Sequence, residues 1–234
     1  MTEELFREDS YVRGFDACIT LIHHDRIILD RTAFYPLGGG QPGDTGTIKF
    51  SSGEEVKVAD TRKDESGSLA HYLESVPENL APGDSVVGQL DWQRRFRFMR
   101  AHTCMHLLCS LVPYDVTGGS IGDGRARLDF DMEEGVDKEV LQRGLDQLIA
   151  GDHPVSYRWI SDAEMEQNLD LVRTMSVKPP MGQGRVRLVE IDGVDLQPCG
   201  GTHLARTGEV GVVKIGKVEK KGRHNRRINL VVEV

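Results

Sequence analysis

The chain changes from strand-like to helical sequence at Asp91-Trp-Gln-Arg-Arg-Phe-Arg-Phe-Met-Arg-Ala-His-Thr-Cys-Met-His106. Asp91 can cap a helix that begins at Trp92. Phe96, Met99 and His102 then recur at helical spacing, and the pattern continues through His106. We therefore expect one helix from Trp92 that ends before Pro113.

The residues before this stretch indicate β structure. Short runs of β-branched and apolar residues alternate with Gly, Ser and Asp turn signals. We expect a hairpin over residues 15–30 and strands over 45–50, 54–60, 69–73 and 85–90. Many short strands with frequent turns favour a small barrel or sandwich, so we expect a small β-barrel domain over residues 1–90.

The residues after this stretch mix helical and strand patterns. We expect a second helix over 137–150 with Gly151 as its stop, and a short acidic helix from Ser161. Strands are expected over 154–160, 184–191, 210–215 and 228–232. The fold class is therefore predicted as α+β, with an α+β zinc-binding domain over residues 91–234 following the barrel.

Composition limits the function classes. The chain has 234 residues and a formal net charge of -8, which argues against general nucleic-acid binding but not against a local basic patch. No apolar run is long enough for a transmembrane helix, and the acidic N-terminus does not resemble a signal peptide. We expect a cytoplasmic protein that binds no membrane.

Two short motifs predict a metal site. His102 and His106 lie four residues apart in the expected helix, which places both imidazoles on one face. Cys199 and His203 lie four apart in Pro198-Cys-Gly-Gly-Thr-His203, a turn-forming sequence. Thiolate and imidazole are ligands that zinc prefers, so we expect one zinc ion per chain. Taken singly, each motif would be better explained by partly buried histidines or by chance.

The remaining histidines and Cys104 are not expected to bind the metal, and the number of ligands bears on whether the site is structural or catalytic. His23, His24, His71, His153 and His224 lack such partners and are interpreted as ordinary polar positions. Cys104 falls on another face of the helix and is not expected to be a ligand. Four ligands favour a structural zinc site, whereas a catalytic site needs a displaceable ligand or another group to direct water. The glutamate of the zinc-peptidase H-E-x-x-H motif is missing.

Two further features are unusual. Gly38-Gly39-Gly40-Gln41 permits either a close approach of the backbone to a ligand or a tight connection in the barrel. Basic residues gather at the start of the first helix (Arg94, Arg95, Arg97 and Arg100) and over residues 214–227 (Lys214, Lys217, Lys220, Lys221, Arg223, Arg226 and Arg227). Two basic clusters on an acidic protein indicate an anionic partner such as RNA.

These motifs together resemble a known family. The segment 91–108, the Cys199-Gly-Gly-Thr-His203 motif and Thr207-Gly-Glu-Val-Gly-Val-Val-Lys214 are similar to the editing domain of alanyl-tRNA synthetase and to its freestanding relatives, the AlaX proteins. The resemblance extends to residues 34–46, and the length and N-terminal barrel look like the medium-sized AlaX type. No synthetase catalytic region is recognisable, so we expect a freestanding enzyme.

The resemblance implies a trans-editing hydrolase that deacylates tRNA(Ala) mischarged chiefly with serine, with glycine as a second candidate. His102, His106, Cys199 and His203 are then the zinc ligands. Thr117 falls near a position where synthetase editing domains carry a glutamine, so Thr117 and Thr103 become the candidates that sense the serine hydroxyl. The expected tRNA contacts are Gly38, Gly39, Gly40, Gln41, Arg226 and Arg227.

Two other readings stay open at this point. The first is a noncatalytic zinc-stabilised tRNA-binding module, which a closed set of four ligands would suit. The second is a zinc hydrolase of small esters or peptides, against which the basic clusters and the missing glutamate count.

Overall fold

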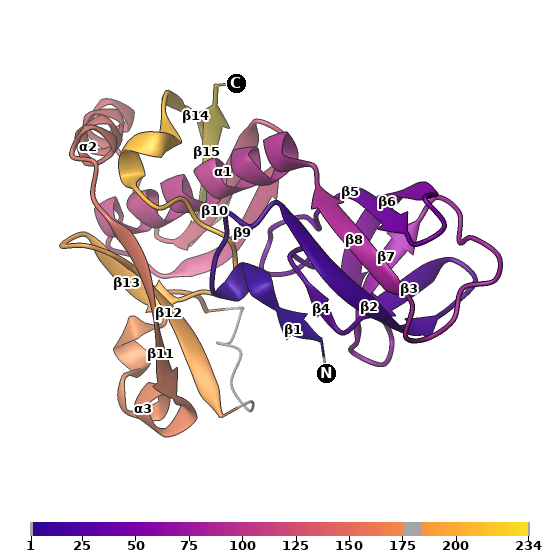
Figure 1. Ribbon diagram of the computed structural model, residues 1–234. Coiled ribbons are helices and arrows are strands. Elements are labelled where there is room, and N and C mark those ends of the chain that lie inside the picture. Colours follow the sequence, from indigo (N-terminus) through magenta and orange to yellow (C-terminus); the bar gives the residue numbers. More distant parts are fainter. Residues whose placement is uncertain (1, 176–183, 234) are drawn as a thin grey trace. The chain divides into compact units, whose positions relative to one another are not determined.

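Six strands of the N-terminal unit, residues 1–96, close into a β-barrel (Figure 1). The structure is a computed structural model that describes residues 2–175 and 184–233. The barrel strands, in their order around the barrel, are β2 (Gly14–Ile22), β3 (Arg26–Leu29), β7 (Leu69–Leu73), β6 (Glu55–Lys63), β5 (Gly46–Phe50) and β8 (Ser85–Leu90). A short parallel pair, β1 (Glu3–Glu4) and β4 (Arg31–Thr32), and a 3-10 turn, η1 (Leu5–Arg7), complete the unit. The predicted β-barrel is thus confirmed.

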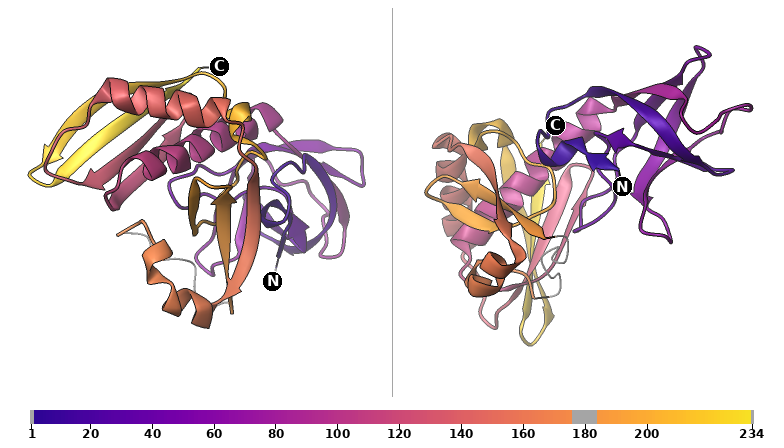
Figure 2. Two further views of the ribbon diagram at one scale, coloured as in Figure 1. Left: turned by 90° about the vertical axis from the view of Figure 1, so that its left-hand side faces the viewer. Right: turned by 60° about the horizontal axis from the view of Figure 1, so that its bottom comes forward.

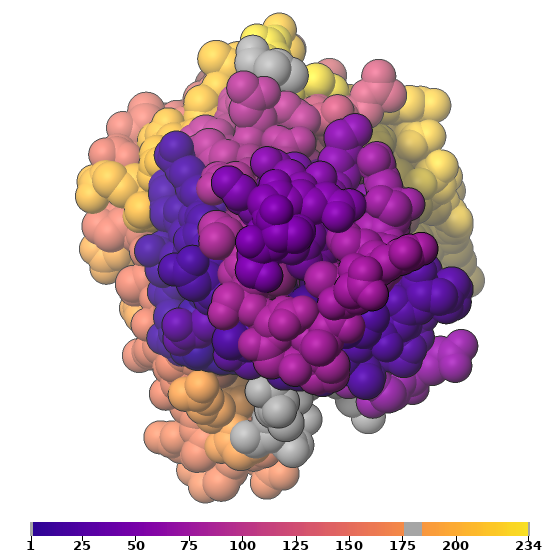
Figure 3. Space-filling view, turned by 45° about the vertical axis from the view of Figure 1, so that its right-hand side comes forward, coloured from indigo at the N-terminus to yellow at the C-terminus, as the bar shows by residue number. Residues whose placement is uncertain are grey.

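The barrel forms because its strands alternate buried and exposed residues. In β8 every second side chain is buried, and β2 and β6 follow the same rhythm over most of their length. Gly88 is needed in β8 because a Cβ there would lie 2.5 Å from the ring of Phe15. Figure 3 shows the surface of this unit from one side, in the colours indigo to magenta.

His71 of β7 is fully buried, so its interpretation as an ordinary polar position is wrong. Its Nε2 lies 2.8 Å from the Thr32 hydroxyl and its Nδ1 lies 3.3 Å from the carbonyl oxygen of Ile27. The amide of Phe34 donates to the Thr32 hydroxyl, whose proton is therefore available for Nε2. Burial lowers the pKa of His71 to about 4, against a smaller opposing effect of the Ile27 carbonyl, so the ring is neutral at pH 7.

The glycine-rich segment is a tight hairpin turn in this unit. Gly38 and Gln41 exchange two backbone hydrogen bonds, of 3.1 and 2.9 Å. Gly39 and Gly40 between them have φ of +57° and +81°, the left-handed values that a type I′ turn requires at both central positions. Of the two alternatives for the consecutive glycines, the structure thus contains the tight connection.

The second unit, residues 97–234, is built on an antiparallel sheet and two longer helices (Figure 2). The strand order is β14 (Val213–Gly222), β15 (Asn225–Val232), β10 (Arg125–Asp131) and β9 (Val116–Gly122). Helix α1 (Trp92–Leu111) begins in the first unit and runs along one face of this sheet, where Met105 approaches Gly119 of β9. Helix α2 (Lys138–Ala150) packs on α1 through Gly144 and Leu111. Both helices were expected from the sequence.

A second, three-stranded sheet carries the rest of this unit. It consists of β11 (Val155–Ser161), β12 (Arg185–Ile191) and β13 (Asp195–Pro198), all antiparallel. The remaining elements are α3 (Asp162–Gln167), η2 (Leu169–Leu171) and η3 (Thr207–Val210). Ser161 forms a capping box with Glu164, which confirms the predicted start of the short acidic helix.

The strand expected over 210–215 is wrong at its start. Residues up to Val210 form η3, Gly211 follows with φ of +68°, and β14 begins only at Val213. The mixed content of helices and strands confirms the α+β class, whereas domains of residues 1–90 and 91–234 stay a prediction. Within residues 2–175 and 184–233, none of the helices is long and apolar enough to span a membrane.

Candidate metal centre

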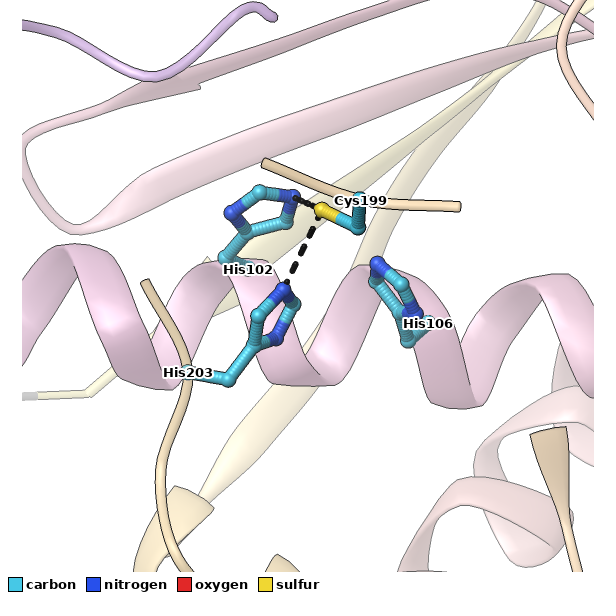
Figure 4. A group of neighbouring side chains, drawn as sticks. All are labelled: His102, His106, Cys199 and His203. Carbon is cyan, nitrogen blue, oxygen red and sulfur yellow. Dashed lines mark hydrogen bonds between the residues drawn. The ribbon is translucent and has the colours of Figure 1, made fainter. Parts of the chain in front are cut away.

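Three histidines and one cysteine converge in the second unit (Figure 4). His102 and His106 project from α1, and Cys199 and His203 come from the segment that follows β13. One donor atom from each of the four lies within 4.8 Å of every other. The structure therefore brings together all four residues that the two motifs selected, and the group can hold a metal ion.

Helical spacing explains the first half of the group. His102 and His106 are one turn apart, and their ring centroids lie 5.4 Å from each other. Asp91 caps this helix, since its carboxylate accepts from the amide of Arg94 at 3.1 Å. Both imidazoles are buried, with 7% and 5% of their surface exposed, so solvent competes little for their nitrogens.

A strand and a glycine turn present the second half. Cys199 directly follows β13, and the amide of Gly201 donates to its Sγ at 3.4 Å. The chain then turns through Gly200 and Gly201, which returns His203 to the same point. The ring of His203 lies 4.3 Å from that of His102 and 4.5 Å from that of His106, between centroids.

The distances suit a tetrahedral metal. The Sγ of Cys199 lies 3.5 Å from Nε2 of His102 and 3.3 Å from Nε2 of His203. Zinc bonds of about 2.0–2.3 Å in a tetrahedron separate the ligand atoms by about 3.3–3.7 Å. These two separations match a tetrahedral ion, and one thiolate with three imidazoles is a combination that zinc accepts.

The electrostatics also favour a cation. Burial raises the pKa of the Cys199 thiol, but the charges of His102 and His203 and its histidine hydrogen bonds lower it well below the ordinary value. Burial lowers the pKa of His106, yet its bonds to Asp195 and Cys199 raise it to about 10. A thiolate and a carboxylate thus draw positive charge into the cluster, and a metal ion can supply that charge in place of a proton.

Sequence reasoning missed Asp195 and Gln197. The Oδ2 of Asp195 lies 2.9 Å from Nδ1 of His106 and 2.8 Å from Nε2 of Gln197. This contact leaves Nε2 of His106 for the cluster, the arrangement in which a carboxylate orients a metal-binding histidine. The available signal was period two, because Asp195, Gln197 and Cys199 share one side of an extended segment.

Thr103 and Cys104 are adjacent in α1, but only Thr103 contacts the cluster. The hydroxyl of Thr103 lies 3.3 Å from Nδ1 of His203 and accepts from the amide of Leu204 at 3.1 Å. Thr103 therefore holds a cluster histidine. Cys104 lies outside the group of four, and burial raises its pKa to about 12, which keeps the thiol protonated.

The other predicted site residues lie on other elements. Thr117 is half-buried on β9, and the glycine turn belongs to the barrel unit, where Gln41 is fully buried. Arg226 is 8% exposed and donates to backbone carbonyls that include those of Gly222 and Glu133. Arg227 forms an ion pair with Asp129, with hydrogen bonds of 2.7 and 2.9 Å.

Two of the four arginines in the basic cluster at the start of α1 are bound within the protein. Arg95 is fully buried and binds Asp44 and the carbonyls of Ser10 and Ala33. Arg100 donates to the carbonyl of Val210 at 2.8 Å. Spacing alone could not show that these cations have partners far away in the chain.

Comparison with known proteins finds similar sequences for both halves of the chain. Residues 186–229 match the family model of the threonyl and alanyl tRNA synthetase second additional domain, and residues 9–94 match the model of class II (A) tRNA synthetases. The alanyl-tRNA editing protein AlaX-M of Methanosarcina acetivorans is 37% identical, over 97% of this chain and 98% of its own length.

Two further relatives differ in how much of their own length this chain covers. AlaX-M of Saccharolobus solfataricus is 34% identical over the full length of both chains. The alanine–tRNA ligase of Sulfurisphaera tokodaii is 36% identical over 94% of this chain but only 25% of the ligase. With relatives of this identity matched from end to end, the chain belongs to the AlaX family of alanyl-tRNA editing proteins.

Proposed function

We propose that this protein is a zinc-dependent trans-editing hydrolase that deacylates mischarged tRNA(Ala), with seryl-tRNA(Ala) as the main substrate and glycyl-tRNA(Ala) as a second. The observation that carries the proposal is the convergence of His102, His106, Cys199 and His203 in a chain of the AlaX family. The names of the relatives support alanyl-tRNA editing, and the buried donor set supports a metal-assisted reaction.

Zinc is the metal that the four donors favour. One thiolate and three imidazoles match its preferences, whereas magnesium and calcium prefer oxygen ligands. When bound, zinc can orient the aminoacyl ester or terminal ribose and lower the pKa of a water molecule. Asp195 and Thr103 would not bind the metal themselves but would orient the rings of His106 and His203, whose Nδ1 atoms they contact.

Selectivity for serine needs a polar partner for its hydroxyl. An apolar pocket rejects an added hydroxyl only weakly, whereas a site built to bind that hydroxyl loses hydrogen bonds when alanine enters. Thr103 and Thr117 are the two candidates. The Thr103 hydroxyl contacts Nδ1 of His203 and the amide of Leu204, so its substitution would also disturb a cluster histidine, and Thr117→Ala is the cleaner first test.

The proposed tRNA contacts are Gly38, Gly39, Gly40 and Gln41 of the barrel unit and Arg226 and Arg227 of β15. Leu37 lies beside the glycine turn and is 54% exposed, so this region offers backbone and an apolar surface to a nucleotide. Arg227 is the better phosphate ligand of the pair, because 25% of its side chain is exposed beside Asp129.

A paired hydrolysis assay tests the proposal. The purified protein is expected to deacylate seryl-tRNA(Ala), and glycyl-tRNA(Ala) more slowly, while sparing alanyl-tRNA(Ala). Cys199→Ala should abolish the reaction because it removes the thiolate, and Cys18→Ala in the barrel serves as the cysteine control. Equal hydrolysis of seryl and alanyl esters, or an active Cys199→Ala variant, would refute the specific claim.

A noncatalytic zinc-stabilised tRNA-binding module is the second candidate, since four protein donors can close the coordination of zinc. It predicts salt-dependent binding of tRNA without turnover. Removal of zinc by a chelator should then unfold the second unit, whereas the hydrolase should lose activity and keep its fold.

A further inference from the structure

Arg187 and Tyr157 form a stacked pair beside the turn that carries Cys199 and His203. Arg187 lies on β12 and is fully buried. Its guanidinium carbon lies 3.7 Å from the centre of the Tyr157 ring on the neighbouring strand β11. A stacked guanidinium is held in one plane, which fixes the direction of its N–H groups.

This pair binds the backbone of the turn at three points. Nη1 of Arg187 donates to the carbonyls of Cys199, at 3.1 Å, and Gly201, at 2.8 Å. The hydroxyl of Tyr157 donates to the carbonyl of His203 at 3.3 Å. The amide of Cys199 donates in return to the carbonyl of Arg187 at 3.1 Å.

The turn needs such support because of its own sequence. Gly200 and Gly201 separate the two donor residues, and glycine has more backbone freedom in the unfolded chain than other residues. The strand β13 ends at Pro198, and beyond Cys199 the next backbone bond to a strand comes at Ala205, whose carbonyl accepts from the amide of Val155 in β11. Contacts at Cys199, Gly201 and His203 restrict the segment along its whole length.

We propose that Arg187 and Tyr157 are positioning residues that hold the Cys199–His203 turn in its metal-binding conformation before the ion arrives. The inference rests on the proposed function in one respect, namely that the four-residue cluster binds zinc. Without the pair, the ion must order the turn when it binds, so zinc affinity falls although no ligand has been removed.

The same strand offers a matched control. Arg185 also stacks on an aromatic ring, with its guanidinium carbon 4.2 Å from the centre of the Trp159 ring, but it is exposed. Arg185→Lys and Arg187→Lys therefore make the same chemical change two residues apart. Lysine keeps the charge in both variants but cannot reproduce the planar fork of Arg187.

The first experiment measures zinc affinity by competition with a chromogenic chelator. Arg187→Lys should weaken zinc binding about 10- to 100-fold, the range seen when the partners of metal ligands are removed. Tyr157→Phe should weaken it less, since one hydrogen bond is lost, and Arg185→Lys should match the wild type. Cobalt substituted for zinc should show altered visible absorption in Arg187→Lys, which a general loss of stability would not cause.

The second experiment follows amide hydrogen exchange of residues 199–203 in the metal-free protein. Exchange should be faster in Arg187→Lys and Tyr157→Phe than in Arg185→Lys. Unchanged exchange together with unchanged zinc affinity would overturn the inference. If Arg187→Lys fails to fold, Tyr157→Phe decides by the same two measurements. A wild-type protein that binds no zinc would overturn the proposed function, and the exchange data would still decide whether the pair orders the turn.

Discussion

The two units bury the same kinds of polar group with opposite results. In the first unit, His71 is satisfied by a hydroxyl and a carbonyl, and Arg95 is satisfied by Asp44 and two carbonyls. In the second unit, three histidines and Cys199 point at one another, with Asp195 behind them. Groups that satisfy each other serve stability, whereas groups that converge on a common point leave a place for a cation.

The largest effect should come from breaking the convergent cluster. His203→Asn is expected to reduce deacylation of seryl-tRNA(Ala) by on the order of 10³-fold or more, because several kcal/mol of metal-based stabilisation are lost. Zinc content, measured on the same samples, should fall well below one ion per chain. His71→Asn should keep both properties, and so should His24→Asn, whose side chain is 89% exposed. Loss of zinc in His71→Asn would refute the contrast.

The next largest effect should come from breaking the buried ion pair between Arg95 and Asp44 in the first unit. Asp44→Asn leaves Arg95 charged and buried without its carboxylate, which should lower the free energy of unfolding by about 3–5 kcal/mol. Amide hydrogen exchange in the barrel strands measures this loss of stability in the first unit. Glu74→Gln breaks an exposed pair with Lys57 and should cost less than about 1 kcal/mol. Equal costs for the two variants would show that burial does not distinguish these pairs.

The pH dependence of the barrel tests the state of His71. Its folded pKa of about 4 lies below the ordinary value of 6.5, so the unfolded chain binds a proton first as the pH falls. The stability that neutral His71 contributes is fully present above pH 6.5 and is lost progressively down to about pH 4. The loss should be about 2–4 kcal/mol. Amide exchange of β3 and β7 against pH measures it, and His71→Leu should flatten this part of the curve.

The smallest effect concerns the carboxylate behind the cluster. Asp195→Asn keeps the shape of the side chain but removes the charge that orients His106, so zinc affinity should fall about 10- to 100-fold. Chelator competition measures this change. Asp192→Asn, an exposed position on the turn before β13, should leave the affinity unaltered. An Asp195→Asn variant with wild-type affinity would show that His106 needs no external orientation.

Much of the fold could be predicted from local pattern. Alternation in β8 and helical spacing in α1 each reflect which face of an element is buried, and burial leaves its mark on successive residues. Strand β9 was not expected, because Gly118, Gly119 and Gly122 have low strand propensity. That strand exists through its pairing with β10, a contact that local pattern does not encode.

At the site, local sequence spacing was enough to select the four residues of the cluster. The spacing of His102 and His106 on a helix, and of Cys199 and His203 around two glycines, selected the four from eight histidines and four cysteines. The meeting of the two pairs, the contacts of Asp195 and Thr103 with two of the rings, and the bonds of Arg187 and Tyr157 to the turn depend on tertiary packing. A buried polar group needs a hydrogen-bond partner, and long-range packing supplies that partner from elements distant in the chain.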